Sequence, residues 1–72
     1  MVEKLIDTIL DWMENDLLTV ECAVSLSLYE SFGILSGQDK VVTAIKSFVG
    51  GWIEKGDAVV IIGCYLTKEG VL

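Results

Sequence analysis

The stretch from residue 38 to residue 67 constrains the fold most, because its hydrophobic pattern changes period partway. On a helix of 3.6 residues per turn, the apolar residues of the first part gather in one arc of roughly 140°. They are Val41, Val42, Ile45, Phe48, Val49, Trp52 and Ile53. After Gly56-Asp57 comes Ala58–Ile62, a β-branched run that is typical of a buried strand. We therefore expect an amphipathic helix followed by a strand.

The residues after this run leave two possibilities for the C-terminal part. Gly63-Cys64 interrupts the run, and residues 65–67 can return as a second strand before Lys68-Glu69-Gly70. This would form a hairpin with a tight, glycine-containing turn. The alternative is one continuous strand with a bulge at Gly63.

The N-terminal residues have the spacing of an amphipathic helix that ends near Asn15-Asp16. Its far side carries an acidic ridge, which consists of Glu3, Asp7, Asp11 and Glu14. One interpretation is a solvated outer face, which is the usual place for charge. The other is a docking surface for a partner with a basic surface, or a mimic of a phosphate backbone.

Residues 20–32 fit both a strand and a helix. Apolar residues alternate from Val20 to Leu28 with a period of two, yet the run is long for a half-exposed strand. Thr19 is a suitable N-cap, and Gly33 suits the left-handed position that ends many helices. We favour a buried helix here. A turn at residues 35–39 follows, with Ser36 as a candidate cap for the next helix.

Composition limits the kind of molecule. The chain has 72 residues, enough for a single small domain over 1–72, and 53% of them are hydrophobic. A body of this size has little interior, so we expect a face to be covered by a second copy in a homodimer. No apolar run reaches the roughly 20 residues of a membrane-spanning helix. The acidic N-terminal pattern does not suit a signal peptide, so a cytoplasmic protein is the expectation.

The residues needed for catalysis are scarce. The sequence has no histidine, and its two cysteines, Cys22 and Cys64, lie far apart. For these cysteines we expect buried free thiols, the alternative being a disulfide. No metal-ligand spacing and no glycine-rich phosphate loop is present. We expect neither an enzyme nor a cofactor or metal site.

Charge is divided unequally along the chain. The whole net charge of −6 falls in residues 1–36, and the second half is neutral. The sequence contains no arginine. Because nucleic-acid binding relies on lysine and arginine to neutralise phosphates, this composition disfavours it.

Two short motifs resemble those of winged helix-turn-helix domains. Trp52–Val59 is similar to the ending of that family's third helix, and Tyr65–Gly70 is similar to the end of its wing. The resemblance implies an α+β fold, with three helices followed by a short C-terminal β-hairpin. It also implies a third helix that reads the DNA major groove. The reading positions would be Gln38, Asp39, Lys40, Thr43, Lys46 and Ser47. The short wing, the acidic first helix and the missing arginines depart from the family's pattern.

Two functions follow from these observations. The first is a non-enzymatic protein-interaction or regulatory module, a homodimer that acts through the acidic ridge or a small-residue face of the third helix. That face shares residues with the reading positions and includes Gly50 beside Thr43 and Ser47. The second is a DNA-binding transcriptional regulator that uses the third helix and the wing. Charge favours the first function, and the order of motifs favours the second.

Overall fold

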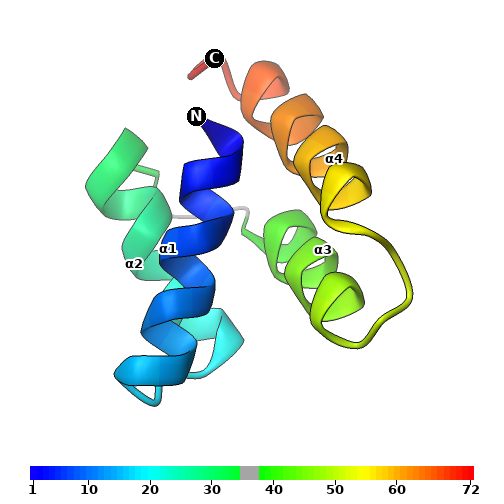
Figure 1. Cartoon of the computed structure of the whole chain (residues 1–72). Helices are drawn as coiled ribbons and strands as arrows, with labels where there is room; N and C mark the ends of the chain where they lie inside the picture. Colours follow the sequence, from blue (N-terminus) through cyan, green and yellow to red (C-terminus); the bar gives the residue numbers. More distant parts are fainter. Residues whose placement is uncertain (35–37) are drawn as a thin grey trace.

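Four helices make up the part of the chain that the structure describes. The structure is a computed structural model, and it describes residues 1–34 and 38–72. The helices are α1 (Val2–Asn15), α2 (Val20–Phe32), α3 (Asp39–Val49) and α4 (Lys55–Lys68). They run alternately down and up, so both termini lie at the same end of the molecule (Figure 1).

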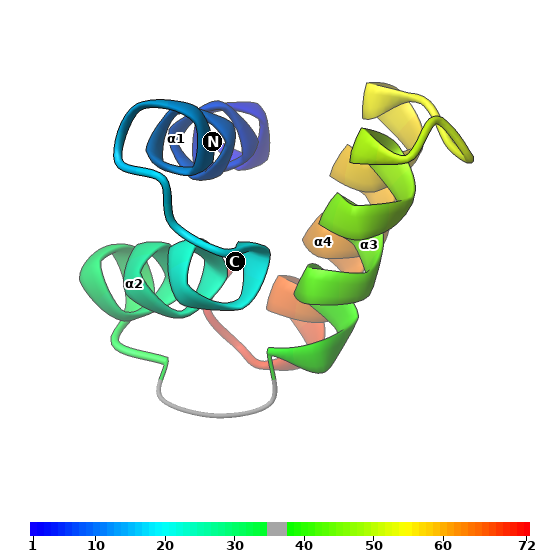
Figure 2. The ribbon, with the colours of Figure 1, turned by 90° about the horizontal axis from the view of Figure 1, so that it is seen from below.

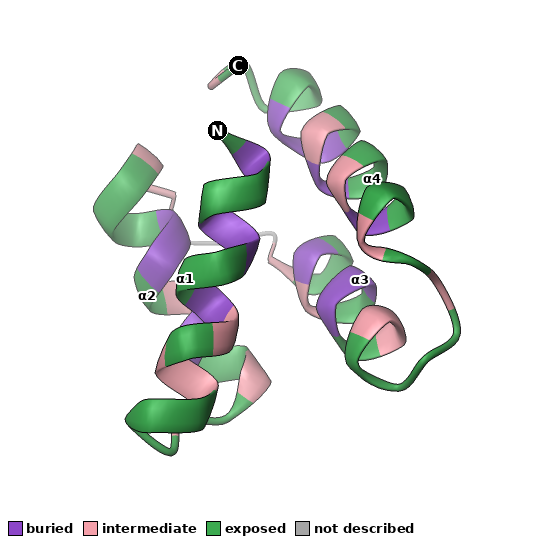
Figure 3. Cartoon of the chain, viewed as in Figure 1, coloured by how far each residue is buried: buried purple, intermediate pink, exposed green. Residues whose placement is uncertain are grey.

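The helices pack in a closed ring around one core. Each helix contacts its neighbours in sequence, and α4 packs back on α1. Seen from below, the α1–α2 pair faces the α3–α4 pair (Figure 2). Every helix alternates buried and exposed residues along its length (Figure 3). Each supplies two large, fully buried side chains: Ile6, Ile9, Val24, Leu28, Val41, Ile45, Ile62 and Leu66.

The helical prediction for residues 20–32 is confirmed, and so are its ends. The Thr19 hydroxyl accepts a hydrogen bond from the Cys22 N–H at 3.2 Å. Gly33 has a φ of +71°, and its N–H donates to the Tyr29 carbonyl at 2.9 Å. The alternation of apolar residues from Val20 to Leu28 does not reflect a strand. It arises because small residues, and not only large apolar ones, occupy the buried side of this helix. Ala23 and Ser27 both face the core.

The predicted strand and hairpin are wrong, because residues 58–62 lie inside α4. Residues 1–34 and 38–72 contain no strand, so the described fold is all-α and neither α+β nor a winged helix. At the start of α4, the Asp57 carboxylate accepts a hydrogen bond from the Glu54 N–H at 3.1 Å. Burial then repeats at helical spacing, through Ala58, Ile62, Tyr65 and Leu66. This packing outweighs the modest preference of β-branched residues for strands.

The third helix is shorter than its apolar pattern predicts. It ends at Val49, and the chain turns at Gly51, where φ is +82°. Trp52, expected on the apolar face of that helix, is therefore 85% exposed. The predicted turn at residues 35–39, with its cap Ser36, lies largely outside the described residues.

Two glycine substitutions test the assigned backbone. Gly33→Ala places a side chain at a positive φ and should lower the free energy of unfolding by about 1 kcal/mol. Gly56→Ala lies in the first turn of α4, where an added Cβ meets nothing within 4 Å. It should raise stability by roughly 0.5 kcal/mol. Urea unfolding of both variants measures the difference, and a destabilising Gly56→Ala would contradict a helix at this position.

Candidate functional site

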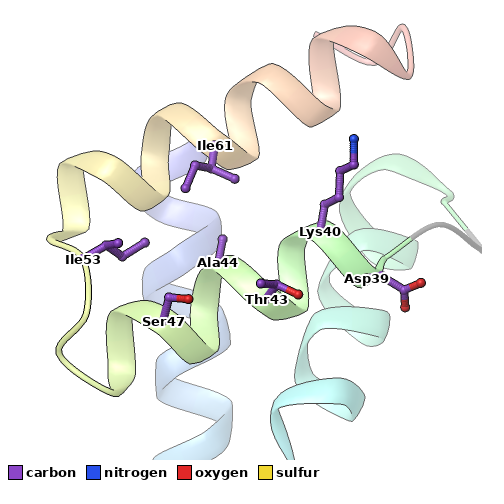
Figure 4. A pocket seen from close by; sticks show the side chains of 7 residues that line it. All are labelled: Asp39, Lys40, Thr43, Ala44, Ser47, Ile53 and Ile61. Atoms are coloured by element: carbon purple, nitrogen blue, oxygen red, sulfur yellow. The ribbon is translucent and has the colours of Figure 1, made fainter.

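An open groove lies between α3 and α4. Its volume is about 300 Å³, and small side chains of α3 form one wall. Figure 4 shows Ile61 of α4 and Ile53 of the preceding loop beside Ala44, with Lys40 at one end. The lining residues are Asp39, Lys40, Thr43, Ala44, Ser47, Ile53 and Ile61. The groove is thus mainly apolar, with polar groups along the α3 side.

The outward side of α4 continues this groove onto the surface. Five exposed residues of α4 fall within an arc of about 100° when placed at 3.6 residues per turn. We call them the α4 face: Asp57, Val60, Ile61, Cys64 and Lys68. Val60 is 63% exposed and Ile61 is 42% exposed. Branched aliphatic side chains in water are an unfavourable arrangement, so this face is a candidate contact surface.

Two lysines, one within the α4 face and one outside it, lie near its apolar residues. Lys40 of α3 and Lys68 of α4 share a hollow with Val60, Ile61 and Cys64. Tyr65 lines the same hollow and is buried. Burial raises the pKa of its phenol, and the negative charges of Glu69 and Asp39 add to this effect. The phenol is therefore neutral at physiological pH.

The predicted interaction face of the third helix is divided between two surfaces. Lys40, Thr43 and Ser47 line the groove toward α4. Gln38 and Lys46 contact α2 instead. The Ser25 hydroxyl donates to Gln38 Oε1 at 3.2 Å.

Lys46 Nζ donates to Glu21 Oε2 at 2.8 Å. This contact lowers the pKa of the Glu21 carboxyl below its ordinary value, chiefly through the hydrogen bond. Gly50 lies outside the groove, and a Cβ there would come within 3.1 Å of the Trp52 ring. The structure thus brings together four of the seven residues expected on that side of the third helix, because Asp39 lines the groove with Lys40, Thr43 and Ser47.

The acidic ridge lies where the sequence places it. Glu3, Asp7, Asp11 and Glu14 are all exposed on α1. Asp7 is nevertheless engaged within the fold, because Lys55 Nζ donates to its Oδ1 at 2.6 Å. This hydrogen bond raises the pKa of Lys55. Asp11 accepts a hydrogen bond from the Asn15 amide, so two of the four carboxylates have partners inside the molecule.

The α4 half of the site was missed from the sequence. The β-branched run Ala58–Ile62 predicts a buried strand, and that prediction places none of its residues on the surface. A signal was present, since Asp57, Ile61, Cys64 and Lys68 follow a 4-3-4 spacing. This spacing places residues along one seam of a helix.

A second apolar stripe crosses the outer side of α2. Leu26 and Tyr29 are 46% and 56% exposed, and Cys22 lies one turn before Leu26. Acidic residues Glu21 and Glu30 flank this stripe. It resembles the α4 face in its apolar content but differs in charge.

Two other kinds of site, a metal centre and a membrane-spanning helix, are absent from the described part of the chain. Residues 1–34 and 38–72 contain no group of three or more cysteine, aspartate or glutamate side chains that could hold a metal ion. In the same residues, every helix is too short or too polar to cross a bilayer. Comparison with protein-family models, curated proteins and solved structures finds no match.

The contact between α2 and α3 can be tested by titration. A carboxyl with a lowered pKa stabilises the fold above its ordinary pKa, and loses that contribution as the pH falls through the lowered value. In the wild-type protein, the Glu21 carboxyl should titrate below the ordinary glutamate value. Lys46→Gln should return it toward that value, as followed by carboxyl carbon NMR shifts. An unchanged Glu21 titration in this variant would show that Lys46 is free to contact a ligand.

Proposed function

We propose that this protein is a non-enzymatic protein-interaction module that forms a homodimer through the α4 face and the adjoining groove. The observation that carries the proposal is the exposure of Val60 and Ile61 beside an apolar groove. Both side chains belong to a helix whose opposite side packs into the core through Ala58, Ile62, Tyr65 and Leu66. α4 is therefore held in place by the core while it presents a second apolar side to solvent.

Burial of this surface provides the driving force for association. Removing a valine or isoleucine side chain from water stabilises by about 1.5–3 kcal/mol when burial is complete. In a two-fold dimer each such residue is buried in both copies, so its contribution counts twice. The groove adds Ile53 and Ala44, which are next to Ile61.

A second copy fits this surface better than a nucleic acid does. The α4 face carries one acidic residue and one lysine, and the groove carries Asp39 beside Lys40. Mixed charge of this kind can complement itself, whereas phosphate binding needs an excess of cations. Lys46, one of the cations expected to contact DNA, is paired with Glu21. The wing on which the DNA-binding prediction depended is a helix.

The acidic ridge of α1 adds a second contact surface to this proposal. Glu3 and Glu14 are exposed, and the ridge lies on a different helix from the dimer surface. A partner with a basic surface binds the ridge of the dimer chiefly through these two residues, because Asp7 is paired with Lys55.

Matched substitutions on the two apolar stripes test the dimer. Light scattering at micromolar concentration should give about twice the 7.9 kDa chain mass. Ile61→Glu introduces charge into the α4 face and should give a monomer. Leu26→Glu makes the same kind of change on α2, at a residue of similar exposure, and should leave the dimer intact.

Two other outcomes of this experiment would contradict the proposed interface. A monomeric wild-type protein at these concentrations would contradict the proposed function. Loss of the dimer in Leu26→Glu with its retention in Ile61→Glu would move the interface to α2. Circular dichroism of both variants should show unchanged helix content, because neither side chain belongs to the buried core.

A further inference from the structure

The distribution of charge along α4 indicates how two copies would pair. Asp57 and Lys68 are eleven residues apart, just over three full turns, so they lie on the same side of the helix. Ile61 and Cys64 lie between them on that side. In an antiparallel pair of α4 helices centred between residues 62 and 63, residue 57 is opposite 68 and residue 61 is opposite 64. Each aspartate then meets the lysine of the other copy.

We propose that the dimer forms by antiparallel two-fold pairing of α4 with α4 of a second copy. This inference rests on the proposed function and specifies its geometry. Asp57 of each copy faces Lys68 of the other, and Ile61 packs against Cys64 across the axis. The two ion pairs lie at the ends of the contact, and the apolar residues lie at its centre. Charge complementarity therefore selects both the orientation and the register.

A small residue at the centre of the α4 face allows such an approach. Cys64 lies there, whereas Gly56 and Gly63 lie roughly 100–120° around the helix, outside the contact. Helix axes in packed pairs are about 8–10 Å apart, and small side chains favour the short end of this range. Asp57 also caps its own helix through Oδ2, and a carboxylate can accept further hydrogen bonds.

The same construction on α2 gives no ion pairs. An antiparallel pair centred on its apolar stripe places residue 22 opposite 29 and residue 25 opposite 26. Glu21 and Glu30 are nine residues apart, two and a half turns, so they lie on opposite sides of the stripe. Glu21 is paired with Lys46 of its own chain, and residues 20–32 contain no lysine that could pair with an acid of the other copy. Of the two exposed apolar stripes, α4 is the one whose charges complement themselves.

A double-mutant cycle tests the ion pairs. Lys68→Glu should weaken dimerisation roughly tenfold, because two attractive contacts become repulsive. Asp57→Asn keeps an oxygen for the helix cap and should weaken the wild-type dimer about threefold. In the Lys68→Glu background, the same Asp57→Asn change should strengthen the dimer, since it removes the repulsion. Lys4→Glu, on the exposed side of α1, is the control with the same change in charge.

Oxidative cross-linking tests the register directly. In a Cys22→Ser background, Ile61→Cys should give a rapid disulfide-linked dimer through Cys64 of the other copy. Adding Cys64→Ser should abolish it, whereas a parallel pair would still cross-link through position 61. Thr67→Cys adds a thiol to the same helix at an exposed position, but it is opposite residue 58 and should not cross-link rapidly.

These outcomes separate the geometry from the function. The antiparallel pairing would be wrong if the wild-type protein is a dimer but shows no energetic coupling between Asp57 and Lys68 and no cross-link through position 61. The proposed interaction module would be unaffected by that result. A monomeric wild-type protein would overturn both. Sedimentation velocity at several concentrations supplies the affinities for this comparison.

Discussion

The limited interior of a 72-residue chain is the constraint on which this structure depends. Four helices of 11 to 14 residues can each bury one side, and together they enclose a core of mainly branched aliphatic residues. Because 53% of the residues are hydrophobic, this core cannot contain all of them. Part of the excess lies on the outer sides of α2 and α4, and the rest lies at the chain ends, in the connections between helices and at the end of α3. Burying it requires another surface, and this need links the composition to the proposed function.

The sequence predicted the first half of the fold well. Both α1 and α2 were expected. Thr19 caps the start of α2 and Gly33 its end, as predicted, because capping is a local property of one or two residues. The second half was predicted incorrectly at residues 58–62. Val59, Val60 and Ile61 favour strands individually, but their burial depends on how α4 packs against α1 and α3. The packing of α4 depends on residues far away in the sequence, so it could not be predicted from residues 58–62 alone.

The candidate site shows the same division. Lys40, Thr43 and Ser47 were expected on an exposed side of the third helix, and they line the groove. Gln38 and Lys46 were expected there too, but they contact α2 instead. The sequence of the third helix shows one continuous polar side, and it does not indicate which part of that side packs against α2 and which part faces α4. Ile61 and Cys64 were missed because a residue assigned to a buried strand is not considered as part of a surface. Self-complementary charge on α4 becomes apparent only after Asp57 and Lys68 are placed on one helix.

Contacts between two copies of α4 are the most direct test of this interpretation. A dimer made by mixing isotopically labelled and unlabelled chains allows intermolecular nuclear Overhauser effects to be selected by filtering. We expect effects between the Ile61 methyl groups of one copy and the Cys64 side chain of the other. Intermolecular effects that arise instead from Leu26 and Tyr29 of α2, with none from Ile61, would contradict it.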